Sequence, residues 1–203
     1  VSGVFQSVDI VSLENLVSDQ ENSFTMEERI DIGALASAHG FTAGDITSID
    51  VNPVKDLIAI GVQAEGYADN GSIVLLDYDG NYIAHTEAGV QPDMVVFTQD
   101  GNYVLTANEG EPRMGYGEGT VDPKGSVTIA KLGGEGFEET TTVDFTSFDA
   151  DRQSLVDNGV LLKPETAPSV DLEPEYIAIA EDGRTAYVSL QEANAIATLD
   201  IET

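Results

Sequence analysis

The 203-residue chain has an ordinary share of hydrophobic residues, 41%, but its 37 Asp and Glu against 8 Lys and Arg give a formal net charge of −29. Such a surface repels phosphate backbones and anionic lipid headgroups and attracts cations, which excludes nucleic acid as a partner and favours Ca²⁺. Without cysteine there are no disulfides or thiolate metal sites, and no apolar run approaches the roughly 20 residues that would insert this segment directly into a membrane.

Short alternating runs of β-branched and aromatic residues, separated by Gly, Asp and Asn turns, predict an all-β chain of antiparallel strands. At the start, "VFQSVDIVSL" and "MEERIDIG" look like the outer hairpin of a repeat unit whose inner pair is missing. The strands expected after it are 46–51, 57–62, 72–77, 94–98, 103–107, 126–131, 138–145, 176–180, 186–190 and 195–201. One helix is predicted at 149–158, where "DADRQSLVDNG" has an Asp cap and a Gly stop.

Three of the predicted hairpins can be laid on one another, and the first two continue into a further hairpin, which makes four strands per unit. Gln63 and its aligned partner Asn108 are 45 residues apart, which matches the roughly 40 to 50 residue period of propeller blades. The next step, from Asn108 to Gln191, is 83 residues because an excursion interrupts the repeat. We therefore expect a β-propeller of four-stranded antiparallel blades, of which this chain covers about half of the ring.

The repeat sets the predicted boundaries. They are a partial blade at 1–45, whole blades at 46–90 and 91–145, an insertion with a short helix at 146–172, and an incomplete blade at 173–203. The chain begins at Val1 without Met, so we expect it to be a piece of a longer polypeptide. An open propeller leaves unpaired strand edges, so self-association through these edges is expected unless further chain closes the ring.

In such blades the start of the first strand and the end of the second lie at the same end of the sheet. Each second strand ends in an amide followed by an acid, and a Pro-acid pair precedes two of the first strands. The candidate ligand-binding residues are Gln63, Glu65, Asn108, Glu109, Glu111, Gln191, Glu192 and Asn194. The candidate metal ligands are Asp93, Glu109, Glu111, Glu173 and Glu175. Carboxylate and amide oxygens suit Ca²⁺, and a ring of them could also receive cationic or polyhydroxyl ligands.

The same polar residues could instead have only a structural role. Strand ends are naturally polar, any loop of so acidic a chain is acidic, and the repeated amide could simply bond a carbonyl of the next blade. The loop at 108–125 is the best functional candidate, because loops of that length in compact β folds are usually binding or lid segments. No catalytic residue is identified: no G-x-S-x-G occurs, and His39 and His85 are expected in a loop and on the surface of an outer strand.

The segments "QPDMVVFTQDGNYVLTANEGEP" and "DLEPEYIAIAEDGRTAYVSLQEANAIATLDI" closely resemble the choice-of-anchor I family of bacterial, surface-layer-like propellers, some members of which are named alkaline phosphatase. The resemblance covers 46–201. It implies a secreted or cell-surface protein, a propeller of roughly seven blades, and a wall or membrane anchor in a part of the parent chain that is not present here.

The sequence and the resemblance together leave two predicted functions. The first is an extracellular, non-catalytic binding module whose acidic face takes a protein or glycan ligand at the cell surface, with Ca²⁺ as the expected cofactor if there is one. The alternative, implied by the resemblance, is a Ca²⁺-dependent, alkaline phosphatase-like phosphomonoesterase at the same face, in which bound cations would polarise the phosphoryl oxygens and activate a water.

Overall fold

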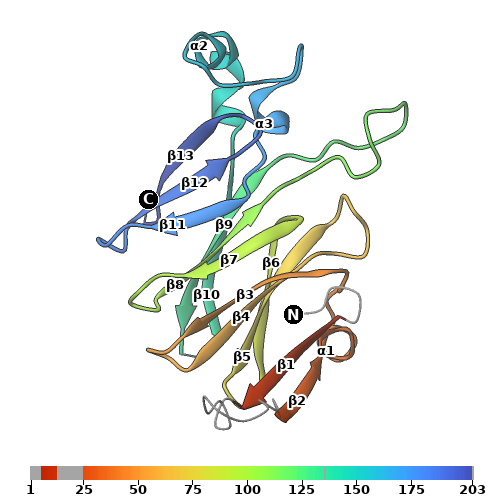
Figure 1. The fold of residues 1–203 in the computed structure, drawn as a ribbon, viewed down its shortest axis with the longest axis vertical. Helices are drawn as coiled ribbons and strands as arrows, with labels where there is room; N and C mark the ends of the chain where they lie inside the picture. The colour runs from red at the N-terminus through yellow and green to blue at the C-terminus, as the bar shows by residue number, and fades with distance from the viewer. Residues whose placement is uncertain (1–5, 13–24, 135, 203) are drawn as a thin grey trace, which may run out of the picture.

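The computed structural model describes residues 6–12, 25–134 and 136–202. Its strands form four antiparallel sheets that follow one another along the long axis of the molecule in chain order (Figure 1). The first sheet contains β1 (Ser7–Ser12) and β2 (Thr25–Asp31), and the second contains β3 (Ile46–Asn52), β4 (Leu57–Val62), β5 (Asn70–Asp77) and β6 (Tyr82–Val90). The third contains β7 (Pro92–Phe97), β8 (Tyr103–Asn108), β9 (Ser126–Gly133) and β10 (Gly136–Asp144), and the fourth contains β11 (Tyr176–Ile179), β12 (Thr185–Leu190) and β13 (Ala195–Asp200).

The ten strands predicted after the first hairpin are all present, with ends shifted by no more than two residues. Strands that follow one another in sequence are also neighbours in each sheet, as expected for antiparallel hairpins with short turns. The Asp-Gly turns contribute to this order, because Gly101 and Gly183 have φ of 69° and 68°, a conformation that glycine adopts without steric cost.

The second and third sheets are joined at their first strands by side chains of β3 that bond the backbone of β7. The N–H of Val95 donates to Ser48 Oγ at 3.1 Å, and the N–H of Phe97 donates to Asp50 Oδ2 at 2.8 Å. These bonds satisfy backbone groups of β7 that face away from its own sheet partner, β8. The polar residues of "TSID" therefore fix how one sheet sits against the next.

Three apolar layers lie between the four sheets. The first contains Ile58, Ile60, Val74 and Leu76 with Val8 and Ile30, the second contains Ile73, Leu75, Val95 and Val104, and the third contains Leu105, Val127, Ile177 and Val188. Successive residues of β4 and β5 enter different layers because side chains alternate between the faces of a strand. The two central strands of each inner sheet, β4 and β5 in the second and β8 and β9 in the third, are thus largely buried on both faces.

Helix α1 (Ile32–His39) follows β2 directly and was not predicted. Asp31 caps it by accepting a hydrogen bond from the N–H of Ala34 at 2.8 Å, and it ends at Gly40, which has φ of 81°. The Asp before an Ala-rich "IGALASAHG" was an available signal. The strand pattern of "MEERIDIG" obscured it.

The two histidines meet between α1 and β6. The ring of His39 stacks on Tyr82 at a centroid distance of 3.6 Å, and Tyr82 Oη lies 2.7 Å from His85 Nδ1. Phe41 covers His85 at a centroid distance of 4.6 Å. His85 is therefore half-buried rather than a surface residue. Its burial is the main cause that lowers its pKa, and the nearby charge of His39 is the second.

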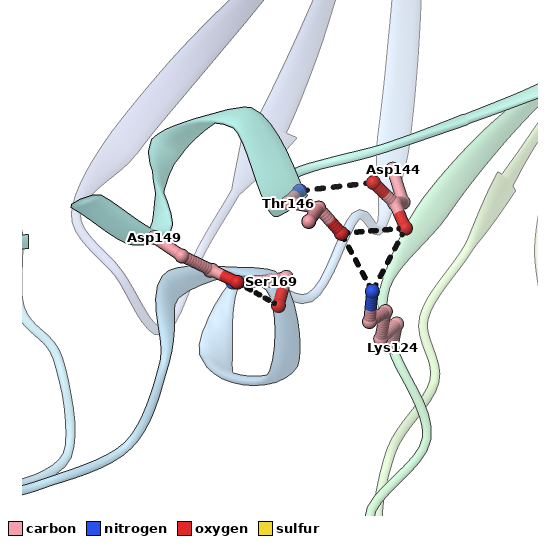
Figure 2. Close-up of polar contacts among 5 residues, drawn as sticks. All are labelled: Lys124, Asp144, Thr146, Asp149 and Ser169. Carbon is pink, nitrogen blue, oxygen red and sulfur yellow. Dashed lines mark hydrogen bonds and ion pairs between the residues drawn. The ribbon is translucent and has the colours of Figure 1, made fainter. Parts of the chain in front are cut away.

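The insertion after the third sheet contains a 3₁₀ helix η1 (Thr146–Asp151), α2 (Arg152–Asp157) and α3 (Pro168–Asp171). The predicted helix is in the right place, but its Asp cap is wrong. Asp149 instead accepts hydrogen bonds from the N–H of Ser169 at 2.8 Å and from its hydroxyl at 3.0 Å (Figure 2). Lys124 donates to Asp144 at 3.2 Å and to Thr146 at 2.6 Å (Figure 2), which ties the insertion to β9 and β10.

Replacing Asp149 by Ala is expected to lower the free energy of unfolding by about 1 to 3 kcal/mol, because the buried Ser169 would lose the two hydrogen bonds that it donates to Asp149. Urea denaturation measures this change. Asp151→Ala is the matched control, since Asp151 makes no capping bond in α2, and it should stay within about 0.5 kcal/mol of the parent chain. Equal losses in both variants would contradict the assigned role of Asp149.

Candidate functional site

The strand registers confirm that the polar ends of the repeat units gather at one end of their sheets. In the third sheet β7 begins where β8 ends, so Asp93 and Glu109 lie at that end. In the fourth sheet the N–H of Glu175 donates to the carbonyl of Ser189 in β12 at 3.1 Å. The start of β3 and the end of β4 have the same relation in the second sheet.

Six carboxylates at the strand ends and loops of the third and fourth sheets are linked by their electrostatic interactions with Glu109 or Glu175, and we name them the acidic patch. They are Asp93, Glu109, Glu111, Glu173, Glu175 and Glu192. The pKa of Glu175 is raised mainly by burial and, as the next largest cause, by the negative charge of Glu192. The patch therefore holds all five predicted metal ligands, and Glu192 in addition.

Glu109 is the most perturbed acid of the patch. It is half-buried at the end of β8, and burial together with the charges of the four acids around it raises its pKa to about 7. The surrounding acids are Asp93, Glu111, Glu173 and Glu175. Each of these effects disfavours the charged form of Glu109, so a cation placed beside this carboxyl would relieve repulsion that the free chain contains.

Asn108 has a structural role, but its partners are hydroxyl groups of its own sheet and not the carbonyl of the next blade that the structural alternative predicted. Its side chain is fully buried, its Oδ1 accepts from Thr106 Oγ1 at 2.9 Å, and its Nδ2 donates to Ser126 Oγ at 3.2 Å and Thr128 Oγ1 at 2.9 Å. Both amide hydrogens are thus used inside the blade, in place of the predicted contact with a ligand.

The remaining predicted ligand-binding residues lie in two places, and one of them, Glu192, is also part of the acidic patch. Gln191, Glu192 and Asn194 belong to the turn between β12 and β13, where the N–H of Asn194 donates to the carbonyl of Gln191 at 3.1 Å. Gln63 and Glu65 line a small pocket beside the second sheet, which none of the acidic patch residues lines.

The loop between β8 and β9 is anchored by the insertion through Lys163, which the sequence reasoning missed. Lys163 Nζ lies 3.0 Å from Asp171 and 3.3 Å from Glu173, two buried carboxylates, and 4.7 Å from the ring centroid of Tyr116 in the loop. Burial alone would lower the pKa of Lys163, but the bonds to Tyr116 and Asp171 and the nearby charges outweigh it and raise this pKa. A basic residue in a chain with only 8 Lys and Arg was the available signal.

Among residues 6–12, 25–134 and 136–202, no three His, Cys, Asp or Glu side chains are grouped closely enough to hold a metal ion. The acidic patch has the oxygen donors that Ca²⁺ prefers, but not in a ready ligating arrangement. In the described part of the chain, no helix combines the length and the apolar character that crossing a membrane requires.

The fold is similar to that of solved structures of low sequence identity. Hydrazine synthase from Kuenenia stuttgartiensis matches with a TM-score of 0.60 at 14% identity, over 99% of this chain and 48% of that chain. The β-propeller domain of Cps50 (Swd1) from Myceliophteria thermophila matches with a TM-score of 0.52 at 10% identity, over 95% of this chain and 48% of that chain. The chain therefore has a propeller-like fold and spans about half the length of these structures.

At the level of sequence, no curated protein matches the chain. The model of the choice-of-anchor I domain matches residues 4–203, in agreement with the resemblance of the "NEGEP" and "LEPEYIA" segments. The chain belongs to the choice-of-anchor I domain family.

Proposed function

We propose that this chain is part of a cell-surface binding module whose acidic patch binds a protein ligand through a basic segment of that ligand. Its family and its propeller-like fold support a module of the binding type, and the family name supports anchoring at the cell surface. The single observation that carries the proposal is the convergence of six carboxylates from two adjacent sheets.

Complementary charge explains why the ligand would be cationic. The free chain carries repulsion between Glu109 and four neighbouring acids, and Lys or Arg side chains of a ligand would remove it. Attraction of this kind raises association rates and weakens with added salt. A glycan is the second class of ligand, but its neutral hydroxyl groups would leave the repulsion in place.

A Lys- and Arg-rich peptide is expected to bind the chain, and isothermal titration calorimetry at two salt concentrations measures the affinity. The double variant Glu109→Gln, Glu175→Gln should bind the peptide about tenfold more weakly. The matched control is Asp79→Asn, Glu181→Gln, which removes two carboxylates from exposed turns at the opposite ends of the sheets. Equal affinity of both double variants would mean that the net charge of −29, and not the patch, attracts the peptide.

The same titration with Ca²⁺ tests the predicted ion. Since the described carboxylates form no ready group of three, Ca²⁺ binding would require side chains to converge, and it should then depend on Glu109. Adding p-nitrophenyl phosphate tests the phosphomonoesterase alternative. We expect no turnover, and turnover that requires both Ca²⁺ and Glu109 would establish that alternative in place of the binding module.

The chain is further proposed to supply about half of a roughly seven-bladed ring. The two inner sheets have four strands, the last has three, and β13 pairs only with β12 in the part of the chain that the structure describes. Ile196 on β13 is 69% exposed. Closure by further sequence would cover this edge, and self-association of the chain through the same edge is the alternative.

A further inference from the structure

A polar pocket of about 180 Å³ lies beside the second sheet, apart from the acidic patch. Its walls come from Gln6, from the segment that enters β3, from the turn between β4 and β5, and from Gln91 and Arg113. A Cβ on Gly44 would lie 2.4 Å from the carbonyl oxygen of Ala64, so two of these walls are in direct backbone contact. The pocket has room for about six water molecules, or for one six-membered sugar ring.

Two buried amides in this pocket have unused hydrogen-bonding atoms. Gln63 is 4% exposed and its Nε2 has no partner among the described residues. Gln91 is 2% exposed, and its Nε2 donates to the carbonyls of Tyr67 at 2.9 Å and Glu111 at 2.8 Å, while its Oε1 has no partner. Buried amide atoms without partners are costly and rare. One donor and one acceptor without described partners therefore belong to side chains of the same pocket wall, and both atoms lie just beneath its surface.

The rim of the pocket selects against anions. It carries three exposed carboxylates, Asp45, Glu65 and Asp69, against one guanidinium, Arg113, whose Nε is already 3.8 Å from Glu111 Oε2. A phosphate or a uronic acid would face net repulsion there. Hydroxyl groups would not, because a hydroxyl can accept from the amide of Gln63 and donate to a carboxylate or to Gln91 Oε1.

We propose that this pocket binds one neutral hexose, either free or at the end of a glycan. A small shift of the two wall side chains lets hexose hydroxyls reach Gln63 Nε2 and Gln91 Oε1, which lie just beneath the pocket surface. The rim carboxylates accept from hydroxyls at the mouth of the pocket. The pocket shares no residue with the acidic patch, although Gln91 and Arg113 of its wall contact Glu111. The variant Glu109→Gln, Glu175→Gln changes neither the pocket wall nor Glu111, and should therefore leave hexose binding unchanged.

The test is an NMR titration of the chain with methyl glucoside, methyl galactoside and methyl mannoside, followed through the side-chain amide signals of Gln63 and Gln91. At least one glycoside is expected to shift these signals with a Kd on the order of 1 mM. Methyl glucuronide should bind at least about tenfold more weakly, because it adds a carboxylate. A disaccharide that binds as tightly as the monosaccharide identifies a glycan end, and one that does not bind identifies a free sugar.

Variants locate the site. Gln63→Met keeps the side-chain volume, removes an amide nitrogen that has no partner, and should weaken hexose binding about tenfold. Gln191→Met makes the same change at the aligned, exposed position of the fourth sheet and should leave binding unchanged. If Gln63→Met fails to fold, Glu65→Gln on the exposed rim is a second variant that tests the site. It should weaken hexose binding at least about threefold. The proposal is overturned if no glycoside shifts the amide signals, or if folded Gln63→Met and Glu65→Gln both bind as the parent chain does.

Discussion

Replacing Lys163 by Met is expected to lower the free energy of unfolding by about 3 to 5 kcal/mol. The side chains of Asp171 and Glu173 are 4% and 6% exposed, and Lys163 Nζ lies 3.0 Å and 3.3 Å from them. Without the ammonium group, whose own side chain is 41% exposed, two almost fully buried carboxylates would be left without their cation. The cost of such unpaired buried charge far exceeds the value of an exposed ion pair.

Urea denaturation at neutral pH measures this loss. Lys131→Met is the matched control, because Lys131 pairs with Glu138 at 2.9 Å while both side chains remain about half exposed, and its loss should cost about 0 to 1 kcal/mol. Similar costs for the two variants would show that the pairing of Lys163 is no more important than a surface contact. The loop between β8 and β9 should also loosen, since Lys163 holds Tyr116.

Replacing Glu109 by Gln is expected to stabilise the chain in mildly alkaline solution. The folded-state pKa of Glu109 is about 7, raised from 4.5, so the folded chain binds this proton more tightly than the unfolded chain does. The stability that comes from this group is complete below pH 4.5 and is lost as the pH rises through about 7. Because Glu109 is only half-buried, solvent screening reduces the expected gain at about pH 8 to about 1 to 2 kcal/mol.

Denaturation at two pH values separates this effect from a general change of charge. Glu109→Gln should exceed the parent chain in stability at about pH 8 and match it at about pH 4.5. The control Glu181→Gln removes an equal charge from an exposed turn far from the patch and should show a much smaller difference between the two pH values. If the parent chain and Glu109→Gln lose stability in parallel over this range, Glu109 does not have a raised pKa.

The strands and their pairing could be predicted because local patterns encode them. Alternation of apolar and polar residues defines the strands, and the Asp-Gly turns at Gly101 and Gly183 mark the ends of hairpins. The repeated hairpins reveal the length of the repeat unit. Sheet geometry then brings Asp93, Glu109 and Glu175 to one end. This part of the site follows from topology alone.

The rest depends on contacts between distant segments, which no local pattern records. Lys163 contacts Tyr116, which lies 47 positions earlier in the sequence. The side chain of Gln91 donates to the carbonyls of Tyr67, 24 positions before it, and Glu111, 20 positions after it. Asn108 illustrates the opposite error. Its repeated position drew attention to it as a ligand residue, but hydroxyls from β8 and β9 use its amide.

The most direct test of the acidic patch is an NMR titration of the Glu109 side-chain carboxyl, with and without the basic peptide. The carboxyl should titrate with a pKa of about 7 in the free chain. The pKa should fall when Glu175 is replaced by Gln, because a neighbouring charge is removed, and should fall further when the peptide binds. A carboxyl that titrates near 4.5 in the free chain, or one that the bound peptide leaves unchanged, would contradict a cation-binding role for this patch.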